Sequence, residues 1–74
     1  MRSVELVTRR GCHLCQEAEE LLQRGGVEVS LLDVDADSEL FRLYDFRVPV
    51  LLIDGRVAAE GRISAAAISL LSAG

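Results

Sequence analysis

Apolar and polar residues follow different spacings along the chain, and these spacings predict its strands and helices. The segment Val4–Thr8 is short and rich in β-branched residues, which is typical of a buried strand. From Leu14 to Gln23 apolar residues recur at helical intervals, which predicts an amphipathic helix that ends at Gly25-Gly26. The segment Val27–Leu31 alternates and then continues through Leu32 and Val34, so we expect a second strand that begins half-exposed and grows more buried toward its end.

A second helix is predicted from Ser38 to Tyr44. Asp35 or Asp37 provides its N-cap, because a carboxylate at that position accepts hydrogen bonds from the first unpaired backbone N–H groups. Asp45 is expected to end the helix, since aspartate tolerates the left-handed conformation. The inward-facing side chains are predicted to be Leu40, Leu43 and Tyr44.

The clearest turn signal in the chain lies between two apolar segments. Val48–Ile53 and Arg56–Ala59 are joined by Asp54-Gly55, a dipeptide that accepts a positive φ at both positions. We therefore predict a β-hairpin. Pro49 is placed at the start of its first strand, where a missing N–H is tolerated.

A short C-terminal helix is predicted from Ser64 through Leu71. Ser64 is a good N-cap, and Ile63 and Ile68 flank it at the spacing of a hydrophobic staple. The full order is therefore β-α-β-α-β-β-α over residues 1–74 as one α/β domain. A right-handed crossover makes the first two strands parallel, and the hairpin completes a four-stranded mixed sheet with helices on both faces.

Composition and charge limit the possible functions. Half of the 74 residues are apolar, which compensates for a chain near the lower size limit of a stable core. The net charge is −4 and all eight basic residues are arginine, which speaks against a nucleic-acid partner. The longest apolar stretch is too short to cross a bilayer, and the N-terminus lacks a signal-peptide pattern, so we expect a cytoplasmic protein without a membrane partner.

The feature with the most chemical content is Cys12-His13-Leu14-Cys15, between the first strand and the first helix. Cys12 is predicted at the helix N-terminus, where unpaired N–H groups and the helix dipole favour a thiolate. In a reducing compartment such a pair is more plausibly catalytic or metal-binding than structural. A complete zinc site needs about four ligands, and the sequence offers only these two thiols and His13, so no metal site is expected. Two buried, inert cysteines are the remaining alternative.

The whole chain resembles the thioredoxin fold, and at this length the small bacterial glutaredoxin-like proteins. The resemblance rests on Gly11-Cys12-His13-Leu14-Cys15, on Arg47-Val48-Pro49-Val50, and on Asp54-Gly55 with Glu60-Gly61-Arg62. It implies that Cys12 is the nucleophile and Cys15 the resolving cysteine.

The same resemblance implies further site residues. Pro49 matches the proline that is cis in this fold and faces the cysteines, and Val48 the residue whose backbone pairs with a bound peptide or glutathione. Arg9 stands where glutaredoxins usually carry a lysine that favours the thiolate and binds a glutathione carboxylate. Gly61 and Arg62 belong to Glu60-Gly61-Arg62, which stands where glutaredoxins usually carry a Gly-Gly pair followed by an acidic residue.

Glu60-Gly61-Arg62 is one of three departures from the glutaredoxin pattern that alter the expected pocket. His13-Leu14 replaces Pro-Tyr, and a protonated His13 would stabilise the thiolate, while an exposed His13 would have little effect. Arg47 replaces threonine. Arg47 and Arg62 are either carboxylate ligands of a different geometry or solvated surface residues.

The expected function is thiol–disulfide exchange on protein or glutathione disulfides. It needs an unidentified reductant, no metal and no organic cofactor, with glutathione as a candidate co-substrate, and we expect a monomer. One alternative is a carrier that holds an iron–sulfur cluster between two subunits through Cys12 and glutathione. Another is an interaction domain whose cysteines are incidental.

Overall fold

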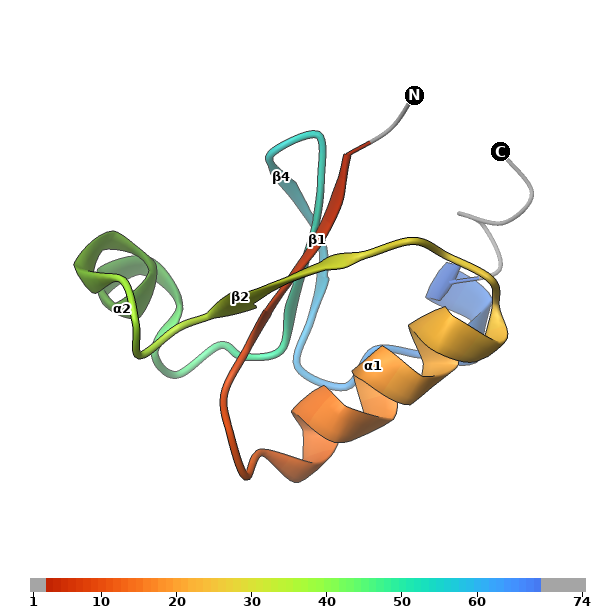
Figure 1. The fold of residues 1–74 in the computed structure, drawn as a ribbon, viewed down its shortest axis with the longest axis horizontal. Helices are drawn as coiled ribbons and strands as arrows, with labels where there is room; N and C mark the ends of the chain where they lie inside the picture. Colours follow the sequence, from red (N-terminus) through yellow and green to blue (C-terminus); the bar gives the residue numbers. More distant parts are fainter. Residues whose placement is uncertain (1–2, 69–74) are drawn as a thin grey trace.

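The computed structural model describes residues 3–68. Over these residues the predicted order of strands and helices is confirmed, and a helical stretch at residues 65–68 follows the last strand. The predicted continuation of that stretch to Leu71 lies outside the described residues. Figure 1 shows the elements, which are β1 (Val4–Thr8), α1 (His13–Arg24), β2 (Ser30–Asp33), α2 (Ser38–Tyr44), β3 (Val50–Ile53) and β4 (Arg56–Glu60).

The four strands form one mixed sheet in the order β2-β1-β3-β4. β1 is parallel to β2 and antiparallel to β3, and β3 is antiparallel to β4. In the β1–β3 ladder Val7 lies opposite Val50. The residues that follow Val7 and those that precede Val50 therefore lie at the same end of the sheet.

The β3–β4 ladder contains one irregularity. Leu51 pairs with Ala59 and Leu52 pairs with Val57, so Ala58 is an extra residue in β4 without a counterpart in β3. Such a bulge increases the local twist of the strand that carries it.

Two apolar clusters fill the two faces of the sheet, as expected when side chains alternate along each strand. α1 and the stretch at 65–68 cover one face, and α2 covers part of the other. The cluster beneath α1 contains Leu6, Ala18, Leu22, Leu51, Ile63 and Ile68. The cluster beneath α2 contains Val7, Val34, Val50 and Leu52, with Leu40 and Tyr44 packed against it.

Helix α1 begins at His13, one residue earlier than predicted, because Cys12 occupies its N-cap. It ends at Arg24, and the next two residues are glycines. Gly26 has a φ of 70°, which a glycine adopts without the steric cost of a Cβ atom. The predicted end of the helix at the glycine pair is confirmed.

Helix α2 has the predicted boundaries and the predicted cap. The Asp37 carboxylate accepts hydrogen bonds from the N–H groups of Glu39 and Leu40, at 2.8 and 3.0 Å. Asp45 does not adopt the predicted left-handed conformation. Its φ and ψ are −47° and −50°, and its N–H still donates to Phe41 O in the helical pattern. The physical reason is that the carboxylate and carbonyl of Asp45 both bind Arg9, which holds the backbone in the helical position.

One prediction of burial is wrong, and another holds only in part. Leu43 was expected to face inward, but it is exposed, and Leu40 and Tyr44 alone carry the inner face of α2. The second strand is predicted to grow more buried toward its end, and Val34 is indeed completely buried, but the strand begins only at Ser30 and Leu31 is 48% exposed. Because β2 is an edge strand with a single neighbour, it is less covered than a central strand would be.

The predicted hairpin is confirmed. Asp54 and Gly55 both have positive φ, 52° and 82°, as a tight two-residue turn requires. Its first strand begins at Val50, two residues later than predicted, and the Val48–Pro49 peptide bond before it is cis, as the resemblance implied.

The start of the C-terminal helix also agrees with the prediction. The Ser64 hydroxyl accepts a hydrogen bond from the Ala67 N–H at 3.2 Å. Ile63 and Ile68 are both buried in the cluster beneath α1, as a hydrophobic staple requires.

Candidate active site

A sharp turn carries the chain from the end of β1 to the start of α1. Gly11 has a φ of 79°, a conformation that other residues rarely adopt. The Cys12 N–H donates to Arg9 O at 3.2 Å, which closes the turn. Cys12 therefore lies at the helix N-terminus, as the sequence predicted.

The Cys12 sulfur acts as the cap of α1. Its Sγ accepts a hydrogen bond from the Cys15 N–H at 3.3 Å, and the Cys12 carbonyl accepts one from the Gln16 N–H at 3.1 Å. A cap needs an acceptor, and a thiolate is a better acceptor than a thiol. The half-buried Cys12 sulfur therefore faces a backbone N–H donor at the start of α1.

Cys15 lies one turn further along α1 and is buried. Burial raises the pKa of the Cys15 thiol, and its hydrogen bond with Cys12 raises it further, although the Thr8 side chain and the Arg9 backbone act in the opposite direction. The two thiols, both free, are thus unequal: one is accessible at the helix end, and the other stays protonated beneath it.

Val48, Pro49 and Gly61 lie at the sheet end where the cysteine turn begins. This follows from the β1–β3 register, because Val48–Pro49 directly precedes Val50 and the turn directly follows Thr8. Pro49 O accepts a hydrogen bond from the Gly61 N–H at 2.9 Å, which joins the end of β4 to this region. Among the described residues, no partner binds the backbone N–H or C=O of Val48.

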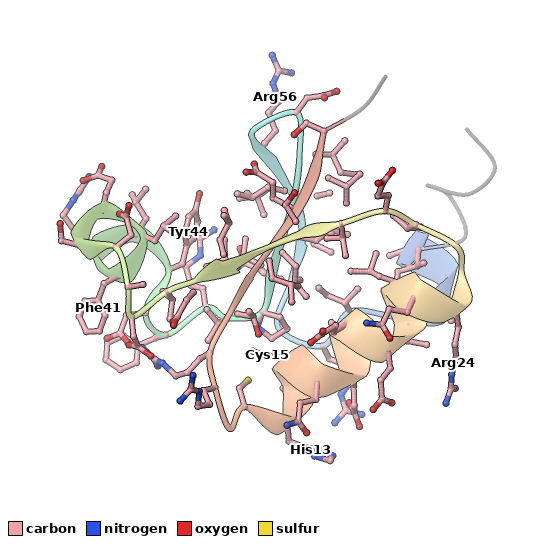
Figure 2. The ribbon with its side chains drawn as sticks, in the orientation of Figure 1. His13, Cys15, Arg24, Phe41, Tyr44 and Arg56 are labelled. Carbon is pink, nitrogen blue, oxygen red and sulfur yellow. The ribbon has the colours of Figure 1, made fainter. Side chains whose placement is uncertain are left out.

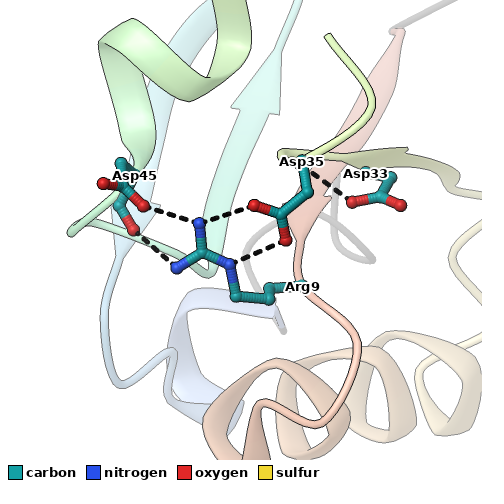
Figure 3. A network of polar contacts seen from close by, with 4 residues as sticks. All are labelled: Arg9, Asp33, Asp35 and Asp45. Carbon is teal, nitrogen blue, oxygen red and sulfur yellow. Dashed lines mark hydrogen bonds and ion pairs between the residues drawn. The ribbon is translucent and has the colours of Figure 1, made fainter. Parts of the chain in front are cut away.

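Arg9 has partners that the sequence did not indicate (Figure 3). Its Nε and Nη2 donate to the two oxygens of Asp35, both at 2.9 Å. Its Nη2 also donates to the Asp45 carboxylate at 2.6 Å, and its Nη1 to Asp45 O at 3.2 Å. These bonds raise the pKa of Arg9 and lower the pKa of Asp35. The Asp35 N–H in turn donates to Asp33.

The other candidate ligands differ in their surroundings. Arg47 forms an ion pair with Glu60, which raises the pKa of Arg47 and lowers the pKa of Glu60. The Arg47 guanidinium also lies 5.1 Å from the ring centre of Tyr44. His13 is exposed, points away from the sheet and lies 3.3 Å from a Glu17 oxygen (Figure 2). Arg62 is exposed next to Gly61.

An open hollow of about 360 Å³ lies on the β2 side of the cysteine turn. β2 and β3 flank β1 on opposite sides, so this hollow and the Val48–Pro49 segment border the turn from different directions. The lining residues are Thr8, Arg9, Arg10, Gly11, Gln16, Glu19, Leu31 and Asp33.

Residues 3–68 contain no group of three or more His, Cys, Asp or Glu side chains arranged to hold a metal ion. Within the same residues, no helix is long and apolar enough to cross a membrane.

Three residues around the cysteines were missed at the sequence level. Thr8 could have been found, because it shares the α1-facing side of β1 with Leu6 and directly precedes the cysteine turn. Asp35 was considered only as a helix cap and Asp45 only as a helix end. Their contact with Arg9 spans 26 and 36 positions of the chain, and no local pattern encodes such a pairing.

Comparisons with known proteins agree with this geometry. A family model described as a glutaredoxin-like domain (DUF836) matches residues 3–70. The X-ray structure of target protein XcR50 from X. campestris is similar to this chain, with a TM-score of 0.81 and 31% identity, covering 97% of this chain and 99% of that one.

A solution NMR structure of protein Ne2328 from Nitrosomonas europaea is also similar. Its TM-score is 0.72 and its identity 28%, covering 95% of this chain and 89% of that one. The comparison with curated proteins gave no match.

Proposed function

The chain belongs to the glutaredoxin-like domain family (DUF836), and from this premise we propose that it is a thiol–disulfide oxidoreductase. In this proposal Cys12 is the nucleophile and Cys15 the resolving cysteine. The observation that carries it is the hydrogen bond from the Cys15 N–H to the Cys12 sulfur. It places a donor against the sulfur of the accessible cysteine, while burial raises the pKa of the Cys15 thiol.

The reaction has two exchange steps. The Cys12 thiolate attacks one sulfur of a substrate disulfide, the substrate S–S bond breaks, and the other sulfur leaves as a thiolate that takes up a proton. Cys15 then loses its proton and attacks Cys12 Sγ. The mixed disulfide breaks, the second substrate thiol is released, and Cys12–Cys15 becomes a disulfide. Two electrons pass from the protein to the substrate, and a thiol reductant returns them.

The residues around the cysteines have distinct roles in this scheme. The backbone of Val48 is available to pair with an extended substrate segment beside Cys12. Thr8 and the Arg9 N–H stabilise the Cys15 sulfur when it becomes negative in the second step. Pro49 and Gly61 fix the segment that presents Val48. Protein and glutathione disulfides are the proposed substrates, and the proposed setting is a monomer in the cytoplasm, where a reductant keeps the pair as a dithiol.

Single-cysteine variants test this assignment. Cys15→Ser should attack a disulfide and then remain as a stable mixed disulfide, because nothing resolves it. Cys12→Ser should form little adduct, since its remaining thiol is buried and protonated. Each variant is incubated with oxidised glutathione and with an oxidised protein such as insulin, and mass spectrometry then measures the mixed-disulfide adduct. Equal adduct formation by the two variants, or adduct on Cys12→Ser alone, would overturn the assignment of nucleophile and resolving cysteine. No adduct on either variant would refute the proposed function.

A further inference from the structure

We propose that this site prefers disulfides within neutral or basic protein segments over oxidised glutathione, because Asp35 and Asp45 already neutralise Arg9. This inference rests on the proposed thiol–disulfide exchange and specifies its substrate class. Asp35 and Asp45 are then specificity-determining residues, which act through the charge they place around Arg9, three residues before Cys12.

The first argument is the number of hydrogen bonds that Arg9 has already made. A guanidinium has five N–H donors, and four of those of Arg9 point at Asp35 and Asp45 (Figure 3). A glutathione carboxylate that approached Arg9 would have to displace one of these partners. Since one cation faces two carboxylates, the group carries a net charge of about −1, and it repels a third carboxylate.

The second argument concerns the remaining arginines near the site. Arg47 is paired with Glu60 and lies against Tyr44, so its charge is also compensated. Arg10 lines the hollow on the other side of the turn. Arg62 is the exposed arginine next to Gly61, and no ion pair binds it within residues 3–68. Glutathione carries two carboxylates, one on its γ-glutamyl residue and one on the glycine that follows its cysteine, whereas Arg62 is the one arginine adjoining the Gly61–Pro49 contact that has no ion pair within residues 3–68.

The third argument is the apolar surface next to the Arg9 group. The ring of Phe41 lies 5.9 Å from the Arg9 guanidinium and is 45% exposed. Phe46 directly follows Asp45 and is 97% exposed. Exposed aromatic rings beside a compensated cation favour apolar side chains of a partner segment over carboxylates. The expected substrate is therefore a cysteine in an extended protein segment with apolar, uncharged or basic neighbours.

Two small disulfides that differ only in their carboxylates show whether the site disfavours the carboxylates of glutathione. One is oxidised glutathione, and the other is the disulfide of glutathione diethyl ester. For each disulfide, the rate constant of its reaction with the reduced protein is divided by that of its reaction with dithiothreitol. This ratio corrects for the different intrinsic reactivity of the two disulfides. We expect the ester to react about tenfold faster at low salt, with a smaller ratio at high salt, as for a charge effect on association. An equal or faster normalised reaction with oxidised glutathione would overturn the inference and leave the proposed function standing.

Asp35→Asn tests the stated cause. It removes one negative charge and keeps an oxygen that accepts a hydrogen bond from Arg9. The ester-to-glutathione ratio should fall about threefold, which is the scale of one exposed ion pair. Glu39→Gln is the matched control, because it removes the carboxylate partner of Arg42 on α2, away from the cysteines, and it should keep the ratio of the unaltered protein.

Asp45→Asn removes the other carboxylate and provides a second measurement if Asp35→Asn alters folding. A ratio that does not change in either variant would refute the role of the two aspartates. A ratio that changes equally in Glu39→Gln would refute it too, since net charge alone would then account for the effect. No reaction with either disulfide or with oxidised insulin would instead refute the proposed function.

Discussion

At the scale of single residues, one helical turn gives Cys12 and Cys15 different surroundings. Cys12 is the N-cap and meets backbone donors, whereas Cys15 is three residues further on and faces the core beneath α1. The position on the helix therefore decides how exposed each of the two cysteines is and which groups it contacts. The sequence was sufficient to predict this difference, because both the spacing of the cysteines and the start of the helix are local features.

Cys15 should react slowly even when Cys12 is absent. Burial raises the pKa of the Cys15 thiol, so less thiolate exists at a given pH than in a free cysteine, whose pKa is about 8.5. In Cys12→Ser, alkylation by iodoacetamide at pH 8 should be at least about tenfold slower in buffer than in urea, where the thiol is exposed. Cys15→Ser, which retains the half-buried Cys12, is the control and should show a much smaller effect of urea. Equal rates for Cys12→Ser in buffer and in urea would show that Cys15 is accessible.

At the scale of elements, α2 depends on polar anchors more than α1 does. None of its residues is fully buried, and only Leu40 and Tyr44 pack on the sheet. Arg9 connects the end of β1 with Asp35 before the helix and with Asp45 at its end. These two ion pairs therefore fix α2 against the turn that carries Cys12.

Acid should weaken this attachment within a defined pH range. The hydrogen bond from Arg9 lowers the pKa of Asp35 in the folded protein, so the carboxylate stabilises the fold above its unfolded pKa of about 3.9. This contribution is lost as the pH falls below that value and through the lower folded pKa. Urea midpoints for the unaltered protein and Asp35→Asn should therefore differ at pH 6 and converge near pH 2. A difference that is constant over the whole range would show that Asp35 titrates normally.

The sequence predicted elements better than it predicted their exposure. Helical spacing placed α1, the Asp54-Gly55 dipeptide placed the hairpin turn, and Asp37 placed the start of α2, because each signal lies within a few residues. The burial of β2 could not be predicted in the same way. It depends on β2 lying at the edge of the sheet, which is a property of the strand order.

The same limit applies to the candidate site. The cysteines, Pro49 and Val48 followed from motifs and from the resemblance. The charge state around Arg9 did not, since it arises when the loops after β2 and α2 meet the end of β1. Arg9 matches a glutathione ligand of the family by its position in the sequence, but in this protein its side chain already contacts Asp35 and Asp45.

At the scale of the whole molecule, 74 residues leave little reserve of stability. A chain of this size is stabilised by about 5 kcal/mol, and the core is divided between two faces of the sheet. Each cluster is small, and so the removal of one large side chain affects the folding of the entire domain.

Leu22→Ala tests this dependence. Leu22 is completely buried beneath α1, and its truncation should cost about 2–5 kcal/mol in the free energy of unfolding. Urea denaturation followed by circular dichroism measures the change. Leu31→Ala is the matched control, because Leu31 is 48% exposed on β2, and its cost should be below about 0.5 kcal/mol. Similar losses for the two variants would contradict the assigned core.

The extra residue in β4 has a consequence for contacts between molecules. An outer strand exposes unpaired N–H and C=O groups, to which another chain can add and begin a fibril. In β4 the bulge at Ala58 breaks the regular spacing of these groups, and charged Arg56 and Glu60 stand at its two ends. On the opposite edge, β2 is only four residues long and ends in Asp33. Strand addition is thus disfavoured at both edges, although Phe41 and Phe46 leave aromatic surface exposed elsewhere on the molecule.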